Sequence, residues 1–286
     1  ATNVQAVYRI MYLISPKFTQ ALKPVQIACE DQGIRMEVIS AYIYENEAKI
    51  YISMQDKTGE RIDETTDLFD SYSINRPFSS SASCNKVDYD PETHTVTFLI
   101  HFTQVEGNKI EGDKITFSVS CFLSKKETYH AKLPIDLSTA SLTPQVQTDV
   151  KIRGMSWQPE EEQPTYYSYL TPLSNSIYEP TPGVSITAMG FINGKLRIQT
   201  HYDNIHETDN HGFLTLKDKD GNKIPSEASV SFWDEQSSGS YDETIFVIEP
   251  EELNSCTIYG DFQTCSSITK GNWQVTFPLE IAEIIK

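Results

Sequence analysis

Alternating apolar and polar positions run through most of this chain from residue 33 onward. Apolar side chains recur at every second position over residues 33–40 and 49–55, with the polar turn Glu45-Asn46-Glu47 between the two stretches. Alternation of period two is typical of a half-buried strand, so this region predicts a β-hairpin. Five further strands are predicted at short intervals, over residues 68–74, 86–89, 95–103, 114–123 and 129–137. The pattern indicates a first antiparallel β-sandwich.

A polar stretch over residues 138–145 separates this region from a second one of the same kind. Residues 184–192 and 195–202 flank Asn193-Gly194, which is a strong signal for a two-residue hairpin turn. Other strands are predicted over residues 147–152, 213–217, 228–233, 241–248, 256–264 and 273–279, with one helical turn at 250–253. We therefore expect a mainly all-β chain of two tandem immunoglobulin-like antiparallel β-sandwiches, comprising residues 1–143 and 144–286.

Two segments depart from the alternating pattern. Apolar residues spaced three or four apart between Val4 and Leu22 predict a short N-terminal helix, interrupted at Ser15-Pro16 and ended by Pro24. Residues 158–182 contain five prolines and predict a long irregular loop. No helix long enough for a crossover between parallel strands is predicted, which excludes parallel α/β folds.

Composition narrows the class of partner. The 286 residues include 23 basic and 40 acidic side chains, for a net charge of −17 and a pI near 4.7. Such a charge excludes a nucleic-acid partner, which needs a basic surface, and disfavours electrostatic docking on anionic lipids. The acidity is concentrated in residues 144–286, whose net charge is −12 against −5 for residues 1–143. We interpret it as a solvated acidic surface.

Three histidines, His201, His206 and His211, lie close together in the sequence with Asp203 and Asp209 among them. These residue types are metal ligands, so a metal-dependent hydrolase is one hypothesis, although a solvated hairpin loop explains the cluster better. No HExxH, GxSxG or phosphate-binding glycine motif occurs in the chain. We therefore expect no enzyme activity and no cofactor.

Four aromatic residues, Trp157, Tyr166, Tyr167 and Tyr169, lie in or beside the proline-rich loop. Their rings either cover apolar surface or form a platform for a carbohydrate ligand, and both interpretations stay open. The five cysteines form no CxxC pair, which excludes zinc-ribbon and thioredoxin sites. Cys256 and Cys265 are close enough in sequence for a disulfide, but isolated buried thiols are the favoured interpretation.

Three stretches resemble a known family. They are residues 25–41 (VQIACEDQGIRMEVISA), residues 50–63 (IYISMQDKTGERID) continuing into 70–74, and residues 271–280 (GNWQVTFPLE). They are similar to the Gram-positive bacterial domain-of-unknown-function family 4179 and its accompanying C-terminal module. The motifs themselves predict turns, at Asp31-Gln32-Gly33 and at 56–59, and a terminal strand in which Trp273 packs between sheets.

The resemblance implies an extracytoplasmic region that follows a cytoplasmic segment and one transmembrane helix. Many members of that family are encoded beside extracytoplasmic-function sigma factors, and no catalytic residues are transferred from it. We therefore expect a membrane-anchored regulator or sensor on the outer face of the cell membrane, with the anchor N-terminal to this chain. Its partner would be an unknown protein or a cell-wall ligand. The alternative functions are a cell-surface adhesin or carbohydrate-binding module, and the metal-dependent hydrolase.

Overall fold

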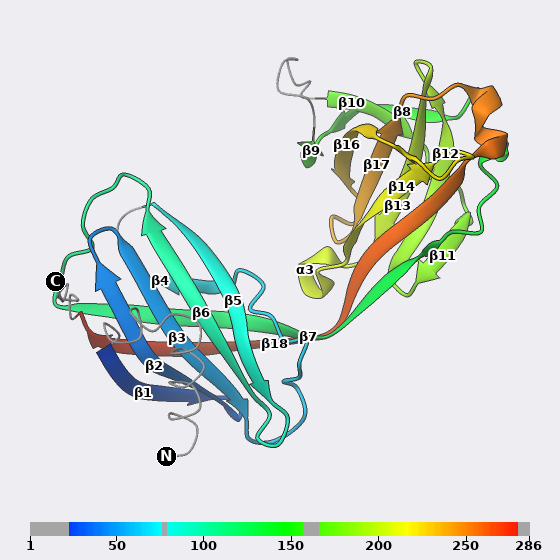
Figure 1. Cartoon of the computed structure of the whole chain (residues 1–286). Coiled ribbons are helices and arrows are strands. Elements are labelled where there is room, and N and C mark those ends of the chain that lie inside the picture. Colours follow the sequence, from blue (N-terminus) through cyan, green and yellow to red (C-terminus); the bar gives the residue numbers. More distant parts are fainter. Residues whose placement is uncertain (1–22, 76–78, 157–165, 280–286) are drawn as a thin grey trace. The chain divides into compact units, whose positions relative to one another are not determined.

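The computed structural model describes residues 23–75, 79–156 and 166–279, and its elements are almost all strands (Figure 1). The expected N-terminal helix and Trp157 lie outside the described residues. The sheets are antiparallel, which confirms the all-β prediction. No helix in these ranges is long and apolar enough to cross a membrane. The chain forms two compact units: residues 1–125 with 267–286 (unit 1), and residues 126–266 (unit 2).

Unit 1 contains two sheets around one apolar core. The first sheet has the strand order β1-β2-β3-β6-β5. Its strands are β1 (Lys23–Asp31), β2 (Ile34–Tyr44), β3 (Glu47–Asp56), β5 (Ser80–Asp90) and β6 (Thr95–Gln104). The second contains β4 (Tyr72–Ile74) and the first part of β7 (Lys114–Lys132) together with the last part of β18 (Thr257–Pro278). Alternate side chains of both sheets, such as Ile52, Phe98, Phe117 and Phe277, fill the core between them.

Unit 2 has three layers. Its main sheet has the order β11-β12-β13-β17-β16-β9, with β9 (Gly154–Ser156), β11 (Tyr178–Thr181), β12 (Val184–Ile192), β13 (Lys195–Tyr202), β16 (Ser226–Trp233) and β17 (Ser240–Phe246). A core that includes Ile198, Leu216 and Phe262 packs one face of this sheet against β14 (His211–Lys217), β15 (Lys223–Ile224) and the first part of β18. The short elements are η1 (Leu137–Thr139), α3 (Ile205–Thr208) and η2 (Pro250–Ser255).

The third layer of unit 2 is a two-stranded sheet of β8 (Val146–Lys151) and β10 (Tyr166–Leu170). A separate apolar cluster joins it to the other face of the main sheet, where Tyr169 meets Val230 and Phe232. We call β8 and β10 together the strap. β10 of the strap lies within the region predicted as an irregular loop. It forms a strand there because it pairs with β8, which is not adjacent to it in the sequence.

The expected boundary between residues 143 and 144 differs from the observed division of the chain. Two pairs of predicted strands, 114–123 with 129–137 and 256–264 with 273–279, are each replaced by one long strand, β7 and β18. Their polar middle stretches resemble turns in the sequence, but polar side chains are compatible with a strand that faces solvent on one side. The C-terminal stretch consequently belongs to unit 1, where Trp273, Val275 and Phe277 are fully buried in the core.

Both predicted hairpins are confirmed. Tyr44 pairs with Glu47 across the turn between β2 and β3, and Ile192 pairs with Lys195 across Asn193-Gly194. Both residues of the second turn have positive φ, 52° and 74°, as a type I′ hairpin requires. The sequence pattern does not predict strands β1, β9, β11 and β15, since each is short, polar or interrupted by proline or a bulge.

Candidate functional site

Five residues from the stretches 25–41, 50–63 and 271–280 form one interlocked corner of unit 1, which we call the signature corner: Asp31, Gly33, Asp56, Arg61 and Trp273. The Asp56 carboxylate accepts hydrogen bonds from the Arg61 Nη2 at 2.7 Å and Nε at 3.0 Å. It also accepts hydrogen bonds from the main-chain N–H groups of residues 58, 59 and 61. Burial alone raises the pKa of this carboxyl, but the hydrogen bonds outweigh it and hold the pKa well below its usual range.

Trp273 connects the C-terminal strand to this corner. Its indole Nε1 donates to the main-chain oxygen of Ile34 at 3.1 Å, and its ring lies 5.8 Å from that of Phe122. The main-chain N–H of the preceding residue, Asn272, donates to the Asp31 carboxylate at 2.7 Å. These polar groups hold turns and strands together, so the role of the corner is structural.

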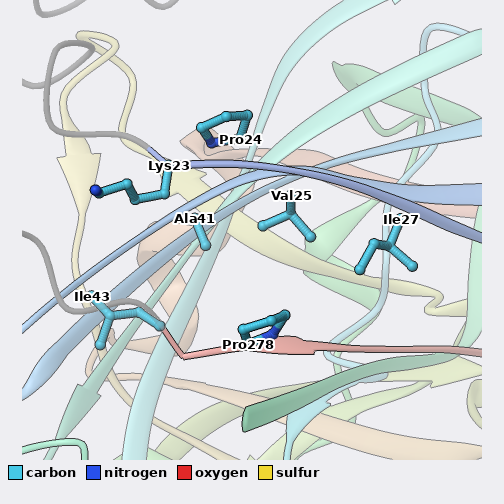
Figure 2. A pocket seen from close by; sticks show the side chains of 7 residues that line it. All are labelled: Lys23, Pro24, Val25, Ile27, Ala41, Ile43 and Pro278. Carbon is cyan, nitrogen blue, oxygen red and sulfur yellow. The ribbon is translucent and has the colours of Figure 1, made fainter. Parts of the chain in front are cut away.

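An apolar groove lies on unit 1 between residues of β1, β2 and the end of β18 (Figure 2). It has a volume of about 290 Å³. Its lining comes from β1, β2 and the end of β18: Lys23, Pro24, Val25, Ile27, Ala41, Ile43 and Pro278. Such a surface fits apolar side chains rather than a polar substrate, because Lys23 is the one charged residue among the described residues of the lining.

The three tyrosines of the predicted aromatic platform, which are the members that the structure describes, do not form a single surface. Tyr166 is 58% exposed, whereas Tyr169 is 6% exposed and stacks on Phe232 at 4.7 Å. The Tyr167 ring lies under the Arg197 guanidinium at 4.6 Å and near Phe232 at 6.0 Å. Tyr167 and Tyr169 therefore cover the main sheet of unit 2, and they do not form an open carbohydrate platform.

The three predicted histidines have separate partners. His201 lies 3.0 Å from the Asp203 carboxylate and 3.4 Å from that of Asp234. The His206 ring stacks on Trp233 at 5.1 Å, and its Nε2 lies 3.1 Å from the Ser237 carbonyl oxygen.

His211, the third, lies 3.5 Å from the Asp209 carboxylate, which Lys126 also contacts at 3.3 Å. The hydrogen bond to Asp209 raises the pKa of His211 above its ordinary value. Within the described ranges, no group of three or more His, Cys, Asp or Glu side chains is arranged to hold a metal ion. The hydrolase hypothesis therefore gains no support from this arrangement. All five cysteines lie in the described ranges and remain thiols, so Cys256 and Cys265 form no disulfide.

Sequence reasoning misses a buried polar cluster beneath the strap, formed by Arg197 and Gln199 of β13 and Glu243 of β17. Arg197 is 5% exposed, and Gln199 and Glu243 are fully buried. The Arg197 Nη1 lies 3.2 Å from the Glu243 carboxylate. Burial raises the pKa of Glu243, and its hydrogen bonds and the nearby guanidinium offset this only in part. Polar side chains at alternate positions of a strand ordinarily indicate a surface that faces solvent. No local sequence pattern around these three residues predicts that the strap covers them.

A second feature missed in the sequence is the stack around Trp233, at the end of β16. Trp233 is 39% exposed, with the His206 ring at 5.1 Å and nearly parallel at 19°. The Arg153 guanidinium lies 5.0 Å from the indole centroid. An exposed aromatic ring beside a guanidinium is a common element of binding surfaces.

Comparisons with known proteins add little to this geometry. No protein-family model matches the chain, and no curated protein matches it. One solved structure is similar over 91% of this chain and 92% of its own: the crystal structure of the conserved domain protein from Bacillus anthracis. The two share 9% sequence identity with a TM-score of 0.29.

Proposed function

We propose that this chain is the non-catalytic, extracytoplasmic region of a membrane-anchored bacterial regulator or sensor. The observation that supports this most is the signature corner. Asp31, Asp56 and Trp273 belong to stretches that resemble the extracytoplasmic family, and their hydrogen bonds with Asn272, Arg61 and Ile34 specify a fold rather than a reaction. A family defined by such residues needs a shared architecture and no shared catalytic group.

The charge of the chain is consistent with this assignment. A net charge of −17 disfavours docking on nucleic acid or on anionic headgroups, and it favours a solvated surface exposed to a protein or cell-wall partner. In this proposal the anchor and the segment that contacts a sigma factor precede the chain in the full-length protein.

The test is the topology of the full-length protein in its own bacterium. We expect protease added to intact protoplasts to degrade this region while a cytosolic marker enzyme survives. Degradation only after lysis would place the region inside the cell and overturn the proposal. Co-purification of a sigma factor with the full-length protein, but not with this chain alone, tests the regulatory part separately.

A carbohydrate-binding module is the second candidate function. The exposed Trp233 stack is a better candidate for its binding platform than the tyrosines of the strap. We expect Trp233→Ala to reduce binding of the chain to purified cell-wall polysaccharide at least tenfold if the stack is the platform. Phe213→Ala is a matched control, because Phe213 is an exposed aromatic residue of the same unit (73% exposed). Equal binding by both variants would reject this candidate.

A further inference from the structure

One face of the main sheet in unit 2 packs against the strap. It binds the main chain of β10 through hydrogen bonds from side chains, and not through pairing of β10 with a strand of that sheet. One edge of β10 pairs with β8 in an ordinary ladder, for example Tyr169 with Gln147. Main-chain groups of residues 168 and 170 instead meet the polar cluster of Arg197, Gln199 and Glu243. The strap and this sheet are drawn together in Figure 1.

Three main-chain groups of β10 are bound in this way. Leu170 donates its N–H to Glu243 Oε1 at 2.6 Å, and its carbonyl oxygen accepts from Gln199 Nε2 at 2.7 Å. The Ser168 carbonyl oxygen accepts from Arg197 Nη1 at 2.8 Å. Thr187 in turn donates to Gln199 Oε1 at 2.7 Å, which fixes the orientation of that amide. Main-chain hydrogen bonding of this kind holds extended peptide ligands irrespective of their side chains.

Alternate side chains of β10 supply the anchoring contacts. Tyr167 and Tyr169 point to the same side of the strand, as the period of two requires. Tyr169 stacks on Phe232 at 4.7 Å and 26°, and Tyr167 lies against the Arg197 guanidinium at 4.6 Å. A strand bound through its backbone with aromatic anchors at every second residue has the contact pattern of a bound peptide.

One buried donor of this face is left over. The Arg197 Nε is buried and has no hydrogen-bond partner among the described residues, although Arg197 as a whole is 5% exposed. Buried polar groups without a partner are rare in folded proteins, because the hydrogen bond that such a group made to water is lost without replacement. The face therefore offers one more hydrogen bond than β10 accepts.

We propose that this face is a binding site for an extended, tyrosine-bearing peptide strand, and that β10 occupies it as an intramolecular ligand. When the strap lifts, Arg197, Gln199, Glu243 and Phe232 are free to take a second strand of the same kind. The site does not depend on the cellular location proposed above.

The test supplies the strand in trans. The double substitution Tyr167→Ala/Tyr169→Ala removes the anchors of the strap and leaves the face unaltered. We expect a labelled peptide of residues 165–171 (TYYSYLT) to bind this variant at least tenfold more tightly than the unaltered chain, measured by fluorescence polarisation. Adding Gln199→Leu, which removes the donor to the peptide carbonyl, should weaken binding about tenfold, the equivalent of one hydrogen bond.

Two controls make the result specific. Lys195→Gln alters the ion pair between Lys195 of β13 and Glu227 of β16, outside the polar cluster, and should leave peptide binding unchanged. A peptide of the same composition in scrambled order should not bind. Absence of binding to the double variant, or equal binding of the scrambled peptide, would overturn the proposal.

Should the double variant fail to fold, hydrogen exchange in the unaltered chain decides the question. A separable strap predicts that amides of β8 and β10 exchange at least tenfold faster than those of β13 and β17. Exchange of all four strands at one common rate would show that the strap is part of the core and not a ligand.

Discussion

Gly33 lies at a position of the signature corner that only a residue without a Cβ can occupy without strain. Its φ is +76°, and a Cβ at this position would lie 2.7 Å from side-chain atoms of Thr58. Glycine is therefore required for two reasons, one conformational and one steric.

We expect Gly33→Ala to lower the free energy of unfolding by about 2–3 kcal/mol, measured by urea titration. Gly107→Ala is the matched control, because Gly107 has almost the same φ, +75°, and a Cβ there would meet nothing within 4 Å. It should cost about 1 kcal/mol, the conformational part alone. Equal losses in the two variants would mean that Thr58 moves aside freely.

Asp56 gives the corner a defined pH dependence. Its pKa is lowered in the folded state from an ordinary value of 3.8, so its contribution is present above that value and lost as the pH falls below it. We expect Arg61→Ala to cost about 2 kcal/mol near neutral pH. The difference between the two chains should shrink below pH 3.8. A difference that is constant with pH would contradict the assigned ion pair.

At the scale of elements, the connection from α3 to β14 depends on His211, Asp209 and Lys126. The pKa of His211 is raised above 6.5, so protonated His211 stabilises the fold fully below that value. The contribution disappears as the pH rises through the folded-state pKa.

We expect the stability difference between the unaltered chain and His211→Gln to be larger near about pH 5.5 than near about pH 8.5, by thermal unfolding. Asp209→Asn should remove the same pH-dependent part, because it removes the partner that holds the proton on His211. Combining the two substitutions should add no further pH dependence. Persistence of the slope in Asp209→Asn would assign it to another group.

At the scale of the whole molecule, unit 2 is a continuous insertion in unit 1. Residues 267–279 return to unit 1 and contribute Trp273, Val275 and Phe277, each at most 2% exposed, to its core. Removing them exposes apolar surface whose burial is worth several kcal/mol, which is a large part of the free energy of unfolding of a domain.

We expect a chain ending at residue 266 to lose the folded signals of unit 1, measured by NMR chemical-shift dispersion, while those of unit 2 remain. Residues 126–266 alone should fold, since every segment of that unit is included. A folded unit 1 without its last strand would show that the C-terminal stretch is dispensable.

The sequence by itself determined the elements whose signals are local. The alternation over β2, β3, β12 and β13, and the turn at Asn193-Gly194, depend on neighbours in the chain, and both hairpins form as predicted. Turn residues such as Gly33 were also identifiable, because a backbone with positive φ restricts residue type locally.

The tertiary structure alone decided which strands meet outside these two hairpins. A period of two assigns side chains to faces but does not say what covers each face, so in the sequence Arg197, Gln199 and Glu243 are indistinguishable from solvent-facing residues, and only the strap above them shows otherwise. The continuity of β7 and β18 and the return of Trp273 to unit 1 likewise depend on contacts between distant segments. Such pairing is set by the burial of whole surfaces, which no short stretch of sequence encodes.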